Sequence, residues 1–431
     1  MSTTNIHVES IAGTRDFYPA DMAIRNWEMN IWRKASLTHG CEEYDAPIIE
    51  RTELWERKAG DDVTNEMYAF VDKDGQKLCL RPEMTPSLCR LLITHLPAAA
   101  LPLRWYSLPQ CWRHEDITRG RKREFYQWNM DIIGGDEVKS DLETVSTIVS
   151  SLKMFGLDTN DAVVYINNRQ ILQKVLNSLG VGDDKFEVAC NIIDKFNKLS
   201  KEELTARLSG EIGMNFENAR KIFDLMEVRS IDKVAELLGD DDDTVKKMRK
   251  FFELAKDYGI ADWLEFNASV VRGLSYYTGI VMEGFCKNPN VKRAFCGGGR
   301  YDNLLSTYGY PEKVSGVGFG MGDVVIVEIL KELGKLPTFE DKIDDMVFAF
   351  NDDLYGPAVQ VSQKLRAKGR TVDLYIKGGK FKKALNYADR KGISRVIFIA
   401  PDEWANGEVT IKNLRETDKD KKQELVKFED L

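Results

Sequence analysis

The residues between Arg104 and Gly134 have the clearest chemical character in the chain, because a run of cations crowds into positions 113–123. The residues in question are Arg113, His114, Glu115, Arg119, Arg121, Lys122 and Arg123. A planar guanidinium can bind two phosphate oxygens at once, so arginines held in fixed positions suit a phosphate ligand. For a charge run taken alone, the alternative is a solvated hairpin tip.

Three further segments place polar groups at turns and favour a binding site over a solvated tip. They are Leu80–Thr85, with Glu83 and Thr85 beside Pro82; Val271–Gly279, with Arg272, Tyr276 and Tyr277; and Ala294–Asp302, a glycine-rich turn with Arg300 and Tyr301. No Gly-x-x-x-x-Gly-Lys-Ser/Thr sequence occurs, which excludes a P-loop nucleotide site.

Together these segments resemble the histidyl-tRNA synthetase family, which belongs to the class II aminoacyl-tRNA synthetases. The stretch at Arg113–Glu115 looks like class II motif 2, and the segments around Arg272 and Gly297 look like the two signatures of the histidine enzymes. The similarity runs from Gly13 to the C-terminus. It implies ATP-dependent activation of L-histidine to histidyl-adenylate and transfer to the 3' end of tRNA(His). Mg²⁺ would accompany ATP, bound mainly by phosphate oxygens.

The implied reaction brings two anions together, the carboxylate of the amino acid and the α-phosphate of ATP. Fixed cations at the α-phosphate therefore supply most of the catalytic help. By resemblance, Arg113 and Arg272 are the catalytic residues, one on each side of the reacting centre. The resemblance also implies an ATP-binding set: Phe125 against adenine, Glu115 at its amino edge, Arg121 toward the outer phosphates, and Arg113 and Gln127.

A histidine substrate presents an α-ammonium group and an imidazole. The ammonium needs acceptors, which Glu83, Thr85 and Gln127 can offer. The imidazole needs one acceptor and one donor, and a carboxylate with a phenol meets that need. The positions that match the family here are Asp131 and Tyr277, with Tyr276 and Tyr301 lining the pocket and Arg272 also contacting histidine. Many family members carry glutamate where this chain has Asp131, which is one methylene shorter.

A larger departure from the family follows the strand predicted over Gly316–Gly322. Class II motif 3 normally has an arginine soon after this strand, where it covers adenine opposite the motif 2 phenylalanine. Here Asp323, Val324 and Val325 follow, with valine where arginine is expected. One face of the adenine site must be built in another way, by the glycine-rich backbone or by an arginine from elsewhere, such as Arg300.

The elements that would position these residues can be read from hydrophobic periodicity. Apolar residues alternate with polar ones on both sides of the cationic loop (Tyr106, Leu108 and Cys111 before it; Phe125, Trp128, Met130 and Ile132 after it), which predicts a sheet surface carrying Arg113 and Gln127. Helical spacing predicts helices over 21–39 and 138–155, and residues 44–49 look like a strand. A long helix followed by a strand is similar to class II motif 1, which implies a homodimer. Further strands are predicted over 269–271, 280–283 and 316–322.

We expect an α/β protein: a catalytic domain of α+β type with a class II antiparallel sheet and flanking helices, a helical insertion domain, and a C-terminal α/β anticodon-binding domain. The expected boundaries are 1–169 and 259–335 for the two parts of the catalytic domain, 170–258 for the insertion and 338–431 for the last domain. The insertion shows amphipathic runs such as 191–198 and 219–226. The acidic cluster Asp240–Asp243 favours a solvated loop or helix cap over a metal site. The last domain alternates strands (346–350, 371–374, 395–400, 408–411) with helices (354–367, 381–391).

Bulk properties narrow the class of protein further. The chain has 431 residues, 43% hydrophobic and 30% charged, too long for one ordinary core. Its net charge of −8 argues against indiscriminate coating of nucleic acid, but residues 342–431 carry 18 Lys and Arg against 15 Asp and Glu, a local balance of +3. The seven cysteines form no Cys-x-x-Cys pair, which predicts reduced thiols and no zinc site. An N-terminus without an apolar core or an arginine-rich leader predicts a cytoplasmic protein.

Two other functions fit parts of the sequence. A synthetase-like regulatory paralogue would bind histidine or RNA without charging tRNA, and the missing motif 3 arginine is its support. A plain RNA-binding protein would fit the positive C-terminal balance but leaves the acceptors Glu83, Gln127 and Asp131 unexplained.

Overall fold

The computed structural model describes residues 8–56, 65–196, 199–271, 276–339, 343–378, 380–418 and 422–431. The chain divides into two compact units, Met1–Pro337 and Thr338–Leu431. No helix in the described part of the chain combines the length and the apolar character needed to cross a lipid bilayer.

The first unit is built around one large sheet, in which nine strands can be traced through the described residues. They are β1 Glu42–Glu43, β5 Leu103–Ser107, β6 Gln110–Trp112, β7 Glu124–Ile133, β8 Ala162–Asn168, β9 Leu264–Phe266, β10 Ile280–Cys286, β11 Ala294–Arg300 and β12 Gly316–Gly322. Their order is β1-β5-β7-β12-β11-β10-β8-β9, and β6 pairs with β7. The outermost pairs, β1 with β5 and β8 with β9, are parallel and the others are antiparallel.

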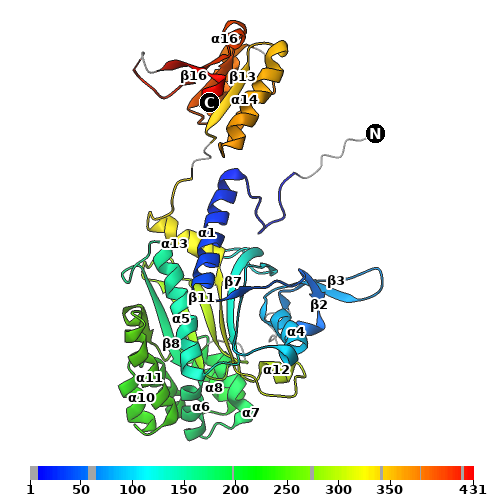
Figure 1. The fold of residues 1–431 in the computed structure, drawn as a ribbon. Helices are drawn as coiled ribbons and strands as arrows, with labels where there is room; N and C mark the ends of the chain where they lie inside the picture. Colours follow the sequence, from blue (N-terminus) through cyan, green and yellow to red (C-terminus); the bar gives the residue numbers. More distant parts are fainter. Residues whose placement is uncertain are drawn as a thin grey trace. The chain divides into compact units, whose positions relative to one another are not determined.

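Three helices pack on one face of this sheet: α1 Pro19–Thr38, α5 Glu137–Met154 and α13 Asp323–Glu332 (Figure 1). Helix α1 begins at Pro19, and proline suits this position because the first backbone N–H groups of a helix have no partner within the helix. Side chains alternate along a strand, so every second residue of β7 faces these helices. Trp128, Met130 and Ile132 accordingly join Trp32 in the main core, which leaves the opposite face of β7 for other contacts.

A smaller three-stranded sheet lies beside the main one, with strand order β2-β4-β3. Its strands are β2 Ile49–Arg51, β3 Tyr68–Val71 and β4 Lys77–Leu80, and α2 Glu53–Glu56, α4 Thr85–His95, η1 Leu96–Ala98 and α12 Leu304–Thr307 lie in the same unit. The predicted strand over 44–49 is wrong for most of its length. Pro47 has no backbone N–H to donate, and the structure has β1 before this segment and β2 from Ile49.

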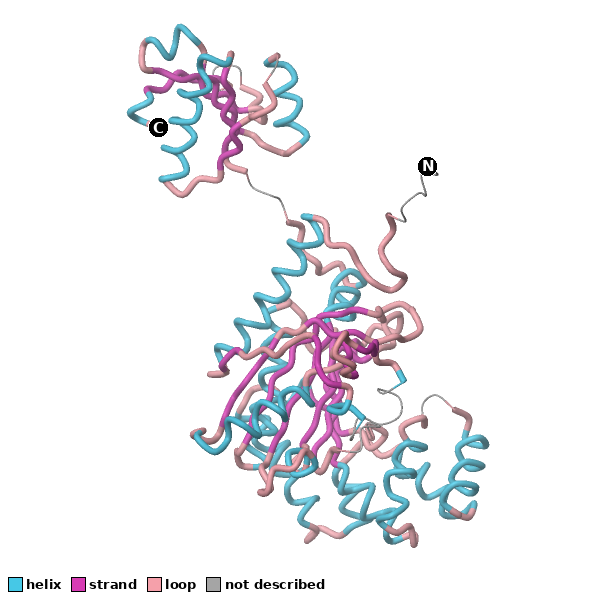
Figure 2. The backbone as a smooth tube through the Cα atoms, turned by 90° about the vertical axis from the view of Figure 1, so that its right-hand side faces the viewer, coloured by secondary structure: helices cyan, strands magenta, loops and turns pink. Residues whose placement is uncertain are grey.

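Helices make up most of the described residues between 169 and 257 and gather beyond the β8–β9 edge of the sheet (Figure 1 and Figure 2). They are α6 Arg169–Ser178, α7 Asp183–Ile193, α8 Lys201–Ile212, α9 Phe216–Met226, α10 Ile231–Leu238 and α11 Asp243–Asp257, followed by η2 Ala261–Trp263. Asp242 caps α11 by accepting hydrogen bonds from the N–H groups of Thr244 and Val245. One residue of the acidic cluster is therefore a helix cap, which is one of the two roles expected for the cluster. The helix predicted over 191–198 ends at Ile193, and positions 197–198 lie outside the described residues.

The strand predicted over 269–271 is also wrong. The chain pairs instead at β9, and residues after it form a turn in which Asn267 Oδ1 accepts from the N–H of Ser269 at 3.0 Å. An asparagine side chain that bonds two residues ahead competes with strand pairing, which explains the difference. The strand predicted over 316–322 is confirmed as β12.

The second unit is an α/β domain whose five-stranded sheet has the order β14-β13-β15-β16-β17. Its elements are β13 Asp345–Ala349, η3 Asp352–Leu354, α14 Tyr355–Ala367, β14 Val372–Leu374, α15 Phe381–Arg390, β15 Arg395–Ile399, α16 Pro401–Ala405, β16 Glu408–Asn413, β17 Gln423–Lys427 and η4 Phe428–Asp430. Val347 packs with α14, and the alternate residues Met346 and Phe348 pack with α15. The predicted strands and helices of this unit are confirmed, and β17 was missed.

Candidate active site

A cavity of about 1220 Å³ opens on the face of the main sheet that α1, α5 and α13 leave free. The structure brings to it every predicted site residue that it describes: Glu83, Thr85, Arg113, Glu115, Arg121, Phe125, Gln127, Asp131, Tyr276, Tyr277 and Tyr301. Arg272 lies outside the described residues. Residues separated by more than 200 positions in the sequence thus share one cavity, because β7, β12, β11 and β10 are neighbours in the sheet.

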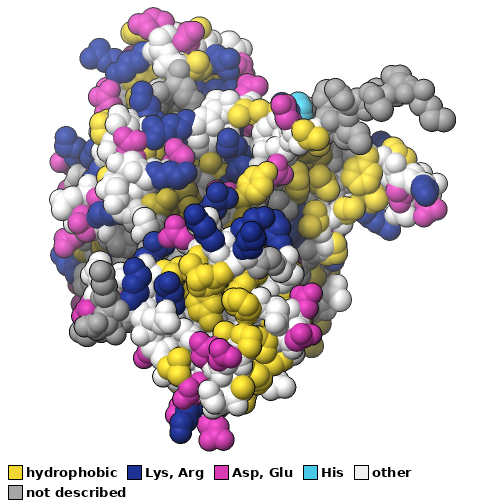
Figure 3. Space-filling view, turned by 90° about the horizontal axis from the view of Figure 1, so that it is seen from above, with side chains coloured by type: hydrophobic (Ala, Val, Ile, Leu, Met, Phe, Trp, Pro, Cys, Tyr) yellow, Lys and Arg dark blue, Asp and Glu magenta, His cyan; other side chains and the backbone are white. Residues whose placement is uncertain are grey.

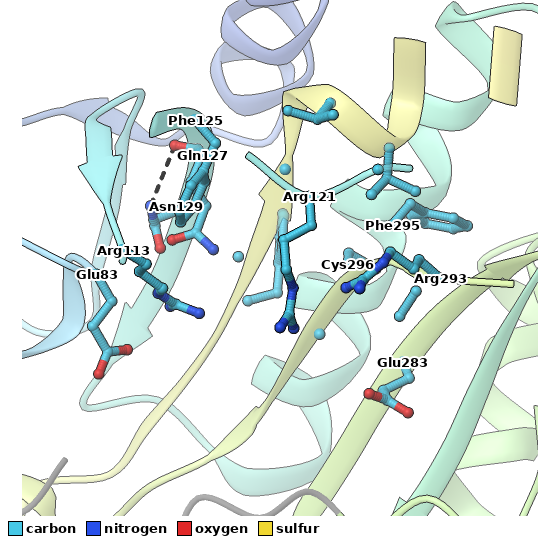
Figure 4. A pocket seen from close by; sticks show the side chains of 18 of the residues that line it. Glu83, Arg113, Arg121, Phe125, Gln127, Asn129, Glu283, Arg293, Phe295 and Cys296 are labelled. Carbon is cyan, nitrogen blue, oxygen red and sulfur yellow. Dashed lines mark hydrogen bonds between the residues drawn. The ribbon is translucent and has the colours of Figure 1, made fainter. Parts of the chain in front are cut away.

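Strand alternation explains how one strand supplies much of the cavity floor. Phe125, Gln127, Asn129 and Asp131 occupy the odd positions of β7 and line the cavity, whereas its even positions face the helices. Figure 4 shows Phe125, Gln127 and Asn129 side by side along this strand.

Glycines in the neighbouring strand β12 keep the floor open. A Cβ atom added at Gly318 would lie 2.0 Å from Asp131 Oδ1, and one added at Gly320 would lie 2.6 Å from Gln127 Nε2. Side chains at these positions would fill the space beside Gln127 and Asp131. The glycine-rich run therefore has a steric cause here, since it leaves room for a ligand above the sheet.

One end of the cavity is cationic and includes an aromatic ring. Arg113 Nε donates to the carbonyl oxygen of Pro82 at 2.9 Å, and its guanidinium lies 5.4 Å from the centre of the Phe125 ring. Arg121 forms an ion pair with Glu115, which is 7% exposed and also lies 3.8 Å from Arg113. Figure 4 shows Arg113 and Arg121 both extending into the cavity. This end can bind a polyanion beside a flat apolar group.

The other end is acidic and lined with phenols. Tyr301 donates its hydroxyl hydrogen to Asp131 Oδ1. Burial raises the pKa of Asp131 to about 7, an effect that the hydrogen bond from Tyr301 opposes. Tyr276 stands with its ring centre 4.8 Å from that of Tyr277 and 6.2 Å from that of Tyr301. A carboxyl group among three aromatic rings is suited to a small planar ligand with polar nitrogens.

A buried ion-pair cluster fixes the strands that carry these groups. Arg15 pairs with Glu124 at 2.6 Å and with Asp323 at 2.9 Å, and Asp323 accepts a hydrogen bond from the N–H of Tyr126 at 3.0 Å. Burial raises the pKa of Asp323 to about 6, while Arg15 lowers it. The cluster joins the Gly13–Asp16 segment, β7 and the start of α13, so it holds the floor of the cavity in register.

Arg300 cannot replace the missing motif 3 arginine, which corrects that expectation. Its side chain is 1% exposed, donates to Asp141 at 2.6 Å and to Asp302 at 3.0 Å, and does not line the cavity. Two carboxylates hold the guanidinium beneath the sheet, away from any ligand.

Several cavity residues were missed by sequence reasoning. They are Asn129, Asn191, Asp194, Lys195, Glu283, Lys292 and Arg293. The alternation along β7 could have identified Asn129, since it lies between Gln127 and Asp131 on the same face. The others come from α7 and the turn directly after it, from β10 and from the turn before β11, and only the tertiary fold brings these segments to the cavity.

Comparison with known proteins agrees with this geometry. The family model for histidyl-tRNA synthetase matches residues 13–323, and that for the anticodon binding domain matches residues 344–431. The chain is 42% identical to a histidine–tRNA ligase, chloroplastic/mitochondrial, of Arabidopsis thaliana, over 95% of this chain and 84% of the relative. It is 32% identical to the histidine–tRNA ligase of Leptospira biflexa, over 96% of this chain and 95% of that one.

Solved structures show the same fold. Histidyl-tRNA synthetase from Nostoc sp. PCC 7120 superposes with a TM-score of 0.80 at 23% identity, covering 98% of this chain and 97% of that chain. A chain described as an ATP phosphoribosyltransferase regulatory subunit/histidyl-tRNA synthetase from Bacillus halodurans C has a TM-score of 0.75 at 22% identity, covering 91% and 98%. The fold alone therefore does not separate the enzyme from a regulatory relative.

The largely antiparallel sheet with its motif 2 strands, together with a C-terminal anticodon-binding domain, defines a class II aminoacyl-tRNA synthetase. Within that class, the family match over residues 13–323 and the 42% identity to a histidine–tRNA ligase are decisive. The chain belongs to the histidyl-tRNA synthetase family.

Proposed function

We propose that this protein activates L-histidine with ATP to form histidyl-adenylate and transfers the histidyl group to the 3' end of tRNA(His). The observation that carries this proposal is the division of one cavity into two chemically different ends. Arg113, Arg121 and Phe125 lie at the cationic end, and Asp131 and Tyr301 at the other. A nucleoside triphosphate suits the cationic end, and an imidazole suits the end with Asp131 and Tyr301.

In this proposal Arg113 contacts the α-phosphate, where the amino acid carboxylate attacks and pyrophosphate leaves. A guanidinium held in advance stabilises the crowded, negatively charged transition state without having to reorganise. The hydrogen bond from Arg113 Nε to the Pro82 carbonyl and the longer ion pair of Nη1 with Glu115, at 3.8 Å, hold the guanidinium at the edge of the cavity. Arg272 is proposed as the second catalytic cation, by family similarity alone.

ATP would place its adenine on Phe125, its amino edge near Glu115, and its outer phosphates toward Arg121. Arg121 pairs with Glu115 in the free protein, so phosphate would take over Arg121 as the base reaches Glu115. Gln127 lies between the two ends. Mg²⁺ would enter with ATP, held mainly by phosphate oxygens.

Histidine would direct its imidazole to Asp131 and its ammonium group toward Glu83, Thr85 and Gln127. Asp131 supplies an acceptor, and Tyr277 or Tyr301 supplies a hydroxyl that can donate or accept. The two further tyrosine rings restrict the pocket to a flat side chain. A site built on paired hydrogen bonds discriminates strongly against side chains that cannot make them.

Three further properties are part of the proposal: a homodimer, a cytoplasmic location and Mg²⁺ dependence. For the homodimer, apolar side chains are exposed on the small sheet and its approach, at Ile48 (43%), Ile49 (48%), Phe70 (42%) and Val71 (65%). Exposed apolar groups also appear between charged ones of both signs on the face drawn in Figure 3. Sedimentation equilibrium tests the dimer, cell fractionation tests the location, and chelation by EDTA tests the metal.

Pyrophosphate exchange with each standard amino acid tests the proposed function. Exchange that depends on histidine alone is expected, followed by charging of tRNA(His). The regulatory alternative predicts histidine binding without exchange. The match to curated histidine–tRNA ligases over nearly the whole chain favours the enzyme.

A further inference from the structure

At the cationic end of the cavity, an aromatic ring is available to contact one face of a bound purine, and the opposite face of the purine would need a second contact. Phe125 offers one flat face to a purine. On the side where α13 begins, Val324 and Val325 line the cavity, and neither has a planar or charged group. A base bound against Phe125 would keep its second face open unless another side chain reaches it.

Arg293 is placed to reach it. This residue precedes β11, lines the cavity, and lies in Figure 4 on the side of the cavity away from Phe125. Its stem is close to the start of α13, because a Cβ atom added at Gly120 would lie 3.2 Å from Arg293 Cδ and 3.6 Å from Val325 Cγ2. Arg293 and Val325 thus flank the same point of the 113–123 loop.

The guanidinium of Arg293 is also available for a ligand. In the parts of the chain that the structure describes, no carboxylate forms an ion pair with it, and its one hydrogen bond goes from Nη2 to Thr118 Oγ1 at 2.9 Å. Burial lowers the pKa of Arg293, repulsion from the neighbouring cation Arg121 lowers it further, and the charge of Glu115 opposes both effects. A bound ligand that is electron-rich would relieve this repulsion.

The neighbouring arginines are already engaged. Arg119 is 55% exposed and pairs with Glu328 and Glu332 on α13. Arg121 pairs with Glu115. Arg300 is enclosed by its two carboxylate partners. Arg293 is therefore the best placed of these cations to cover a purine.

We propose that Arg293 lies flat on the face of the ATP adenine opposite Phe125 and so does the work of the missing motif 3 arginine. This inference rests on the proposed function, since it requires ATP at the cationic end. Arg293 acts as a substrate-binding residue with little role toward histidine, whose pocket lies at the other end of the cavity.

The test is histidine-dependent pyrophosphate exchange by the full-length protein, with ATP and histidine varied separately. Arg293→Ala should raise the Michaelis constant for ATP about tenfold, as expected for the loss of a desolvated cation–π contact, and leave that for histidine within about twofold. Arg293→Lys should stay close to Arg293→Ala, since an ammonium cannot stack as a planar guanidinium does.

Two variants separate stacking from other roles. Thr118→Val removes only the hydroxyl that accepts from Arg293, so it should leave the Michaelis constant for ATP unchanged. Arg249→Ala removes an arginine of the helical region that pairs with Asp232 and Asp240, and should also be neutral.

Three outcomes would overturn the inference while the proposed function stands: an unchanged Michaelis constant for ATP in Arg293→Ala, full recovery in Arg293→Lys, or a Thr118→Val effect as large as that of Arg293→Ala. Recovery by lysine would mean that a point charge on phosphate suffices, and an effect of Thr118→Val would mean that Arg293 only anchors the loop. Absence of histidine-dependent exchange in the unmodified protein would instead overturn the proposed function and this inference together.

Discussion

At the scale of single residues, the pKa of the Asp131 carboxyl group is subject to two opposing effects: burial raises it, and the hydrogen bond from Tyr301 lowers it. Asp131 is 5% exposed, burial raises its pKa to about 7, and its Oδ1 accepts a hydrogen bond from the hydroxyl group of Tyr301. A folded-state pKa above the ordinary value of 3.8 means that the folded protein holds this proton more tightly than the unfolded chain. The carboxyl group thus favours folding at low pH, and this contribution is lost as the pH rises through about 7.

Asp131→Asn should therefore make the free protein more stable than wild type at neutral pH. The gain should grow between about pH 4 and pH 7 and stay constant above, because asparagine has no charge to desolvate. Thermal unfolding of both proteins across this range measures it. A gain that does not change with pH would show that the pKa of Asp131 is the same in the folded and the unfolded protein.

The same substitution should weaken histidine binding. Asparagine cannot accept from the imidazole as a carboxylate does, and a buried polar partner left unpaired costs roughly 1 to 3 kcal/mol. The Michaelis constant for histidine should rise about tenfold or more, and that for ATP should not change. Equal effects on both substrates would mean that Asp131 shapes the whole cavity and does not read the side chain.

Arg113→Ala should lower the turnover of pyrophosphate exchange far more than it weakens ATP binding. Removal of one preorganised cation at the transition state costs on the order of 3 kcal/mol, about 100-fold in rate. Single-turnover adenylate formation would measure the chemical step directly. A loss confined to ATP affinity would place Arg113 in binding alone.

At the scale of secondary-structure elements, strand β12 is important because it has no side chains on the face toward the cavity. Every second residue of this strand is glycine, and the residues between them, Val317, Phe319 and Met321, belong to the main core. The strand is thus packed on the helix side and bare on the cavity side. Because β12 has no side chains on the cavity side, the side chains of Gln127 and Asp131 on β7 have room to extend into the cavity.

Gly318→Ala should abolish histidine binding and strain the pairing of β12 with β7, because its methyl group would lie 2.0 Å from Asp131 Oδ1 and 2.7 Å from the carbonyl oxygen of Met130. Gly210→Ala is the matched control: it lies on exposed α8, no heavy atom stands within 4 Å of an added Cβ, and a helical alanine should be slightly stabilising. Isothermal titration with histidine measures the effect. Normal histidine affinity in Gly318→Ala would show that Asp131 can move aside.

At the scale of the whole molecule, the two units have separate hydrophobic cores. Val347 and Phe348 belong to clusters confined to the second unit, and Asp345 inside it is buried and paired with Arg370 and with Arg395, the latter at 3.0 Å. All described residues of the candidate site lie in the first unit. Adenylate chemistry and tRNA binding can therefore be separated by truncation.

A protein ending at Pro337 should keep histidine-dependent pyrophosphate exchange while tRNA(His) charging falls by at least about tenfold, since a positively balanced domain suited to the RNA backbone is gone. Circular dichroism checks that the truncated chain is folded. Unimpaired charging would show that residues 338–431 contribute nothing to tRNA recognition.

The sequence by itself determined the family, most elements and the residues of the two ends of the cavity. These signals are local: Arg113 to Phe125 form one hairpin, β12 is a continuous glycine-rich run, and Asp242 caps the helix that follows it. A local pattern survives in any tertiary arrangement, because hydrogen bonding and side-chain alternation act between residues a few positions apart.

Only the tertiary structure decided which cations face the ligand. Arg293 and Arg300 lie seven positions apart near the two ends of one glycine-rich segment, yet the first lines the cavity and the second is enclosed by Asp141 and Asp302. Nothing in their immediate sequence separates them. Their difference comes from the pairing of β11 with β10 and β12 and from the position of α5, which supplies the carboxylate of Asp141 across 159 residues of sequence. The guanidinium of Arg300 is held by the carboxylate of Asp141, and the tertiary fold brings these two groups together.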